Sequence, residues 1–160
     1  MMKVTLIAPE GLKEKYLREA ADEYIKRLHG FCDLKIAEFS PFKLPDKPSE
    51  SQIAAALDRE AEQILKRIPS SGSRTAALCI EGKMLSSEEL AAEIRAADNS
   101  GTPFTFIIGS SHGLAEQVKR TADIRLSFSK MTFPHQLFRV LLLEQLYRAY
   151  KINSGGAYHK

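Results

Sequence analysis

The chain has 160 residues, of which 44% are hydrophobic and 27% are charged, with a formal net charge of +3 at pH 7. This length and composition are typical of one globular domain, so we expect residues 1–160 to form a single domain, and we exclude disordered, fibrous and large multi-domain proteins. No apolar run approaches the roughly 18 residues that cross a bilayer, and no signal peptide precedes the first strand, so we expect a cytoplasmic protein without a membrane anchor.

The first half of the chain predicts two strands and two helices. Residues 3–8 form a short apolar strand before a Pro-Glu-Gly turn, and in residues 12–28 the apolar side chains recur at helical spacing. An alternating strand follows at 34–39. The segment SPFKLPDKPS, with three prolines within eight residues, then predicts an irregular loop. A Ser49 cap, with Gln52 three residues later, predicts a helix that ends at Ile68.

The second half repeats this alternation. Residues 75–80 predict a buried strand, and Ser86 or Ser87 caps a helix that extends to residue 97. Residues 103–108 and 123–127 predict two further strands separated by a short helix, and a long helix follows over 134–152. Five strands that alternate with five helices predict an α/β fold: one open parallel sheet with helices on both faces.

The turn GSSHG, residues 109–113, lies between a predicted strand and a helix. It satisfies GxSxG, the pattern that exposes a serine nucleophile, and Asp123 with His135 or His159 follows in the chain order of α/β-hydrolases. A small serine hydrolase that uses Ser111 is therefore one hypothesis, although only one strand follows this serine and no HGGG-like segment precedes it. The same turn is also typical of a ligand-binding loop at the end of a parallel strand, or of a turn that needs glycine only for its backbone.

Two segments near the carboxyl terminus suggest burial of a ligand or of a second surface. The loop 126–135 mixes hydroxyl groups with apolar side chains that could pack around a nucleoside thioether. The helix after it is apolar almost all round at residues 140–143, which indicates either a homodimer interface or a helix central to its own core. Glu144 and Arg148 are four residues apart and predict a local salt bridge.

The chain ends in Ala-Tyr-His-Lys after two glycines. Such tails commonly fray, but these side chains also suit a nucleobase clamp, in which Tyr158 stacks, His159 accepts a proton and Lys160 meets phosphate. From His112 to Lys160, eight Lys or Arg residues stand against three Asp or Glu residues. This excess of positive charge indicates either a solvated face or a surface for RNA.

The cysteines and histidines give no sign of a disulfide scaffold or a metal site. There are two cysteines, and Cys79 lies within an apolar run, where a free thiol behaves as a small core residue. No two of the four histidines have metal-ligand spacing. We therefore expect no metal and a reducing compartment.

Four segments together carry a family resemblance: LCIEGKMLSSEELA from Leu78, FIIGSSHGL from Phe106, LSFSKMTFPHQLFRVLLLEQLYRAYKI from Leu126, and the terminal AYHK. They closely resemble the bacterial ribosomal RNA large subunit methyltransferase H family of the SPOUT superfamily. The similarity spans the whole chain and is most specific in residues 126–160. The chain differs from the family at one turn, where members often have two glycines and this chain has Gly109 followed by Ser110.

The resemblance implies a SPOUT methyltransferase fold with a deep carboxyl-terminal trefoil knot and a homodimer. It implies that S-adenosylmethionine is the cofactor and that the substrate is N3 of a pseudouridine in a stem-loop of 23S rRNA within the assembled ribosome. Tyr158 and His159 would be catalytic, with His159 as the candidate base, and Lys160 and Arg139 would contact RNA. By motif, the cofactor-binding residues would be Leu78, Gly109, Phe128, Ser129, Lys130, Met131, Thr132 and Phe133. A non-catalytic RNA-binding module is the second alternative, beside the hydrolase.

Overall fold

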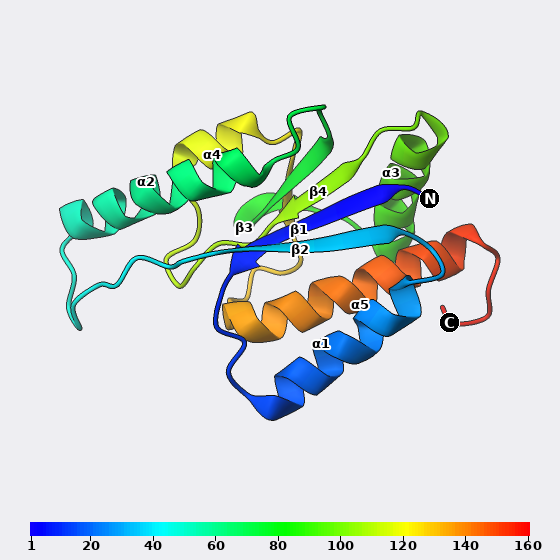
Figure 1. The fold of residues 1–160 in the computed structure, drawn as a ribbon, viewed down its shortest axis with the longest axis horizontal. Coiled ribbons are helices and arrows are strands. Elements are labelled where there is room, and N and C mark those ends of the chain that lie inside the picture. Colours follow the sequence, from blue (N-terminus) through cyan, green and yellow to red (C-terminus); the bar gives the residue numbers. More distant parts are fainter.

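The computed structural model describes residues 1–160 and contains five strands that alternate with five helices (Figure 1). In chain order these are β1 (Lys3–Pro9), α1 (Lys15–Leu28), β2 (Asp33–Phe39), α2 (Glu50–Arg67), β3 (Arg74–Met84), α3 (Ser87–Asn99), β4 (Phe104–Ile107), α4 (Glu116–Thr121), β5 (Ile124–Ser127) and α5 (His135–Asn153). The number and order of the elements agree with the prediction. The largest differences in bounds are at α1, which begins three residues later than expected, and at β3, which continues four residues further.

All five strands are parallel, and their order across the single sheet is β2-β1-β4-β3-β5. The predicted open parallel α/β sheet is therefore confirmed. Strands β4, β3 and β5 are neighbours, and parallel strands all end at the same edge of a sheet. The loops that follow these three strands consequently meet at one place, which is where open α/β sheets bind ligands.

Helices cover both faces of the sheet, as predicted. Helices α1, α3 and α5 pack on one face, and α2 and α4 pack on the other; Figure 1 shows α2 and α4 above the sheet and α1 and α5 below it. Successive strand residues alternate between the two cores, so that Leu6 belongs to the larger core and Ile7 to the smaller one. Phe104 and Phe106 stack in the larger core with ring centroids 4.7 Å apart.

Two serine caps fix where helices α2 and α3 begin. The Ser49 hydroxyl accepts from the Gln52 backbone N–H at 3.2 Å, and the Gln52 side chain accepts from the Ser49 N–H at 2.8 Å. Ser86 and Glu89 form the same capping box with distances of 3.1 and 2.7 Å. The Ser49 cap is thus confirmed, and of the two serines proposed for α3 it is Ser86 that acts as the cap.

Helix α5 is central to the larger core. Val140, Leu142 and Leu143 are buried against the chain's own sheet and helices, and only Leu141 of this run is half-buried. By sequence, the apolar run at 140–143 is consistent with either a homodimer interface or a helix central to its own core. The structure supports the second explanation for Val140, Leu142 and Leu143. They offer no surface to a second copy.

Strand β3 contains a large irregularity on the side of β5. Leu78 and Lys83 both pair with Leu126, so the four residues between them loop out of the ladder. A Cβ at Gly82 would lie 2.7 Å from the Arg125 carbonyl oxygen, which only a glycine avoids. This bulge explains why the strand was predicted to end at residue 80: the apolar run stops there, although the backbone rejoins the ladder at Lys83.

No helix combines the length and the apolar character needed to cross a membrane. No group of three His, Cys, Asp or Glu side chains lies close enough together to hold a metal ion.

Arg139 occupies a position that differs from its predicted role in RNA contact. The residue is 7% exposed, and its Nη2 donates to the Pro9 carbonyl oxygen at 2.5 Å and to Glu38 Oε2 at 2.9 Å. Its guanidinium thus joins α5 to the ends of β1 and β2. A buried guanidinium with protein acceptors is not presented to phosphate, so the expectation of RNA contact is corrected to a structural role.

We expect Arg139→Ala to lower the free energy of unfolding by about 2 kcal/mol, since it removes charged hydrogen bonds and leaves the Pro9 carbonyl without this donor. Urea unfolding followed by circular dichroism measures the change. Lys15→Ala is the control because Lys15 and Glu19 form an exposed pair at 3.7 Å, which should contribute almost nothing. Equal stability of Arg139→Ala and the wild type would contradict the structural role.

Candidate functional site

A cavity of about 800 Å³ opens at the carboxyl edge of the sheet, between the bulge in β3 and the loops that follow β4 and β5. Three segments line most of it: residues 78–81 in the β3 bulge, residues 108–114 in the turn after β4, and residues 126–135, except Lys130, after β5. These segments are far apart in the sequence. The strand order β4-β3-β5 brings them together.

Seven of the eight residues predicted to bind the cofactor line this cavity: Leu78, Gly109, Phe128, Ser129, Met131, Thr132 and Phe133. Lys130 is the exception, since it is exposed and does not contribute to the lining. The residues selected by motif therefore lie around one concave space large enough for a nucleoside ligand.

The loop after β5 is held by its own hydroxyl groups and by aromatic packing. The buried Ser127 hydroxyl donates to the Ser129 carbonyl oxygen at 3.0 Å, and the Met131 N–H donates to the Ser129 hydroxyl at 3.0 Å. Phe128 packs against Phe138 of α5 with ring centroids 4.8 Å apart. The cavity consequently has a fixed apolar wall on the side of α5, and Phe138 was not among the predicted residues.

The turn after β4 needs glycine for two different reasons. A Cβ at Gly109 would lie 2.4 Å from the carbonyl oxygen of Gly113, so the close approach of two backbone segments excludes any side chain. Gly113 has a φ of +86°, in the left-handed region. Ser110 has no positive φ, and its hydroxyl donates to Glu60 Oε1 at 2.6 Å. The turn therefore accommodates serine where relatives of the family often have a second glycine.

The β3 bulge adds polar residues that sequence reasoning missed. Cys79 and Glu81 line the cavity together with Lys119 of α4, which donates to the Glu81 carboxylate. This hydrogen bond to Lys119 lowers the pKa of Glu81, while burial raises the pKa of Cys79 and keeps its thiol protonated. Nothing in the apolar pattern of residues 75–80 signals a loop-out, so only the glycine at position 82 could have indicated it.

His135, the first residue of α5, also lines the cavity. Burial, with a further contribution from the Arg139 charge, lowers the pKa of His135 below its ordinary value. Its imidazole is therefore neutral near pH 7 and adds no positive charge to the cavity.

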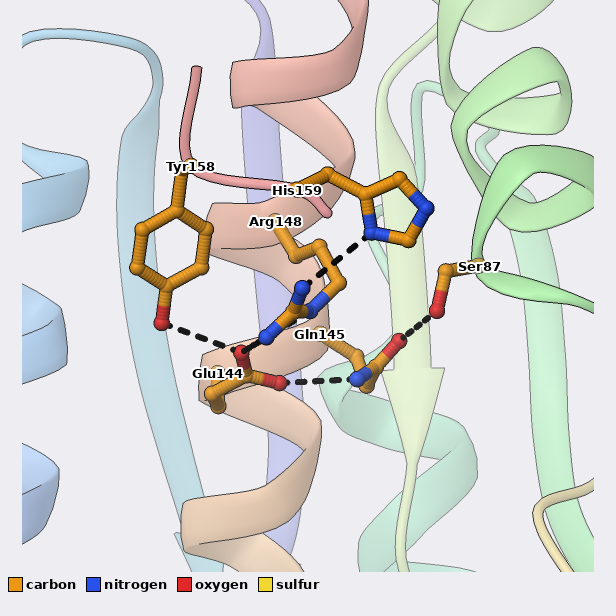
Figure 2. A network of polar contacts seen from close by, with 6 residues as sticks. All are labelled: Ser87, Glu144, Gln145, Arg148, Tyr158 and His159. Carbon is orange, nitrogen blue, oxygen red and sulfur yellow. Dashed lines mark hydrogen bonds and ion pairs between the residues drawn. The ribbon is translucent and has the colours of Figure 1, made fainter. Parts of the chain in front are cut away.

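The carboxyl-terminal tail lies elsewhere, along the outer side of α5 (Figure 2). The Tyr158 hydroxyl donates to Glu144 Oε1 at 3.1 Å, and Arg148 Nη2 donates to the same oxygen at 2.6 Å. The Tyr158 ring packs edge-on against Tyr147 with centroids 4.9 Å apart. The predicted Glu144–Arg148 salt bridge is thus confirmed. The same two side chains also bind the tail, since Glu144 contacts Tyr158 and Arg148 contacts His159.

His159 has both ring nitrogens engaged. Arg148 Nη1 lies 3.1 Å from Nδ1, and Glu88 Oε1 lies 2.6 Å from Nε2. A guanidinium can only donate, so Nδ1 accepts, and Nε2 carries a proton that it donates to Glu88. Burial and the contacts with Tyr24 and Glu144 raise the pKa of Tyr158 to about 12. Tyr158 is therefore a neutral phenol near pH 7, suited to stacking and donating rather than to accepting a proton.

Within one chain the tail does not reach the cavity. Neither Tyr158 nor His159 lines it. At a helical rise of 1.5 Å per residue, Glu144 and Arg148 lie about 14 and 20 Å along the axis from His135 at the cavity. The two halves of the predicted site are consequently separated along α5.

The structure does not assemble a hydrolase triad. Ser111 is exposed at the carboxyl edge of the sheet. Asp123 lies at the opposite edge, before β5, where its carboxylate accepts from the Thr75 N–H at 2.8 Å. His159 is bound to Glu88 and Arg148, as described above. An acid at the far edge of the sheet cannot orient a histidine beside Ser111.

Comparison with known proteins gives consistent matches over the whole chain. The family described as "Predicted SPOUT methyltransferase" matches residues 2–159. Proteins called ribosomal RNA large subunit methyltransferase H from Lactococcus lactis subsp. cremoris and Bifidobacterium adolescentis are 46% and 51% identical over 160 residues, covering 99% of this chain and 100% of each relative. A solved structure of a probable methylase family protein from Haemophilus influenzae matches with a TM-score of 0.54 and 15% identity over 99% of this chain and 70% of that chain. At this identity the structural match shows a shared fold alone.

We expect a fluorophosphonate probe to leave Ser111 unlabelled. His135 lines the same cavity as Ser111, but no hydrogen bond joins the Ser111 hydroxyl to a histidine, and the Asp123 carboxylate that would orient such a base is bound to the Thr75 N–H. Intact-protein mass spectrometry after incubation with the probe measures labelling, and Ser111→Ala provides the background. Stoichiometric labelling of the wild type that disappears in Ser111→Ala would revive the hydrolase.

Proposed function

This chain belongs to the SPOUT methyltransferase family, and we propose that it transfers the methyl group of S-adenosylmethionine to large-subunit ribosomal RNA. The proposed target is N3 of a pseudouridine in a stem-loop of 23S rRNA, on the assembled ribosome in the cytoplasm. The observation that carries the proposal is the cavity at the ends of β3, β4 and β5, lined by seven residues that the family resemblance selects for the cofactor. The identical name of two full-length relatives supports the RNA substrate.

The lining of the cavity fits S-adenosylmethionine. Gly109 and Gly113 both line the cavity without a side chain, so a ring or a ribose can approach their main chain closely. Phe128, Phe133 and Phe138 supply an apolar wall, and His135 is held neutral in it. A neutral imidazole suits a cofactor with a positively charged sulfur because it does not repel that charge.

When bound, S-adenosylmethionine would supply a methyl group already activated by its positive sulfur. The chain then has two tasks: to hold the acceptor nitrogen in line with that methyl group and to take up the proton of the N3–H. The loops after β4 and β5 orient the cofactor and exclude water. His159 is the proposed base, and Tyr158, a neutral phenol, is proposed to stack on or donate to the nucleotide.

We infer a homodimer, and the separation between tail and cavity supports it. Since Tyr158 and His159 lie about 14 to 20 Å along α5 from their own cavity, we propose that each tail serves the cavity of the partner subunit. This argument for a dimer does not depend on the apolar run at 140–143, which packs within its own chain.

Lys160 is exposed and is proposed to contact RNA phosphate. A trefoil knot in the segment from β4 to α5 also belongs to this proposal.

The proposal is tested by incubating the protein with ribosomes that lack the modification and with methyl-labelled S-adenosylmethionine. Label in 23S rRNA, recovered as N3-methylpseudouridine after nuclease digestion, is the expected result. Binding to ribosomes that does not depend on the cofactor, with no label transferred, would instead favour the non-catalytic RNA-binding module.

Gly109→Ala should lower methyl transfer by roughly 10²-fold, because displacing the turn by about 1 Å misplaces the bound cofactor. Calorimetry with S-adenosylmethionine should show a matching loss of affinity. Gly30→Ala is the matched control, since nothing lies within 4 Å of a Cβ at that position and its φ is not positive. If Gly109→Ala binds the cofactor like the wild type, the turn is not part of the cofactor site.

His159→Ala should lower the rate by about 10²- to 10⁴-fold and leave cofactor affinity unchanged, as expected for loss of a general base. His29→Ala, at an exposed histidine after α1, is the control. Mixing Gly109→Ala with His159→Ala tests the shared site: mixed dimers hold one intact site, so about a quarter of the wild-type rate should return. No recovery in dimers shown to be mixed would mean that the tail serves its own chain.

A further inference from the structure

A second, smaller cavity of about 280 Å³ adjoins the first. Its walls are the proline-rich loop between β2 and α2, the second and third turns of α2, and the turn after β4. Ser110, Ser111 and His112 line both cavities, so the smaller cavity is separated from the larger one only by this turn. None of the roles described so far uses it.

One buried carboxylate on α2 binds the other two walls of the smaller cavity. Glu60 of α2 is 3% exposed. Its Oε1 accepts from the Ser110 hydroxyl at 2.6 Å, and its Oε2 accepts from the Phe42 N–H at 2.8 Å. The proline-rich loop and the turn after β4 are thus fixed to the same side chain. The cavity is therefore a preformed site rather than a gap between mobile loops.

The rim of this cavity carries an aromatic ring with a cation stacked on it. Phe42 is 44% exposed, and the Arg59 guanidinium lies 5.1 Å from the centre of its ring. Lys43 and Lys47 are exposed in the same loop, with Asp46 as its single acidic residue. An exposed aromatic ring together with several cations is the combination that binds an unpaired base and its phosphate.

We propose that this cavity binds one unpaired nucleotide of the rRNA that flanks the methylated base. The inference rests on the proposed function and adds a second contact to it: Phe42 stacks on the flanking base and Arg59 meets its phosphate. A volume of about 280 Å³ accommodates a base but not a longer segment. Because Ser111 and His112 border both cavities, the neighbouring nucleotide is delivered to the mouth of the larger one.

The proposal separates substrate binding from cofactor binding. Phe42→Ala should raise the KM for ribosomes by about 5- to 100-fold, the effect of losing one stacked base, with the affinity for S-adenosylmethionine unchanged by calorimetry. Arg59→Ala should raise the same KM and reduce the slope of log affinity against log salt by about one. Both side chains are outside the core, and thermal unfolding checks that the variants remain folded.

Two controls match these changes. Tyr16→Ala removes an aromatic ring that is 66% exposed on α1, on the opposite face of the sheet. Lys66→Ala removes one positive charge from the same helix as Arg59, two turns further along. Both should leave the KM for ribosomes within about twofold of the wild-type value.

A photo-crosslink gives a readout that does not depend on catalysis. With p-benzoylphenylalanine in place of Phe42, irradiation in the presence of ribosomes should label 23S rRNA within a few nucleotides of the methylated base. Crosslinking to a ribosomal protein instead, or an unchanged KM in Phe42→Ala, would overturn the proposal. Failure of the wild type to methylate rRNA would overturn the proposed function itself, so the two outcomes are distinguishable.

Discussion

Burial of α5 between α1 and α3 is the constraint on which both parts of the candidate site depend. Leu142, Leu143 and Leu146 are at most 2% exposed, and each contributes about 2 kcal/mol when removed from water. This packing fixes the helix along the sheet. Its first turn then supplies His135 and Phe138 to the cavity, whereas its third and fourth turns supply Glu144 and Arg148 to the tail. One rigid helix thus determines the distance between the cavity and the tail.

The cavity itself depends on places where backbone approaches backbone. Gly82 lies against the Arg125 carbonyl, and Gly109 lies against the Gly113 carbonyl, at distances that no Cβ allows. The first contact lets β3 loop out and rejoin β5, and the second folds the turn after β4 back on itself. Since loops shaped by such contacts have little freedom to rearrange, the cavity is largely formed before a ligand enters.

Sequence reasoning predicted the layers of this protein well because they follow from local periodicity. Apolar spacing, the Ser49 cap and the order of strands and helices all depend on neighbouring residues, and the structure agrees with them. The β3 bulge, the Lys119–Glu81 pair and the burial of Arg139 were missed because each depends on a partner that is distant in the sequence. The sequence shows that Arg139 is charged but not that it is buried, so it predicts contact with RNA where the structure has a buried guanidinium.

The docked tail has a consequence for the proposed chemistry. His159 Nδ1 accepts from Arg148 and Nε2 donates to Glu88, so neither nitrogen is available to the substrate in this arrangement. Release requires breaking these two contacts and the Tyr158–Glu144 hydrogen bond. These contacts lie at partly or fully exposed sites, where water competes for the same donors and acceptors, so each contributes little to holding the tail. Stacking and phosphate contacts with an RNA partner can offset that cost. The tail is therefore held in place in the free protein by a few weak contacts. Under the proposed function, the substrate would displace the tail, and the freeing of His159 would be coupled to the arrival of RNA.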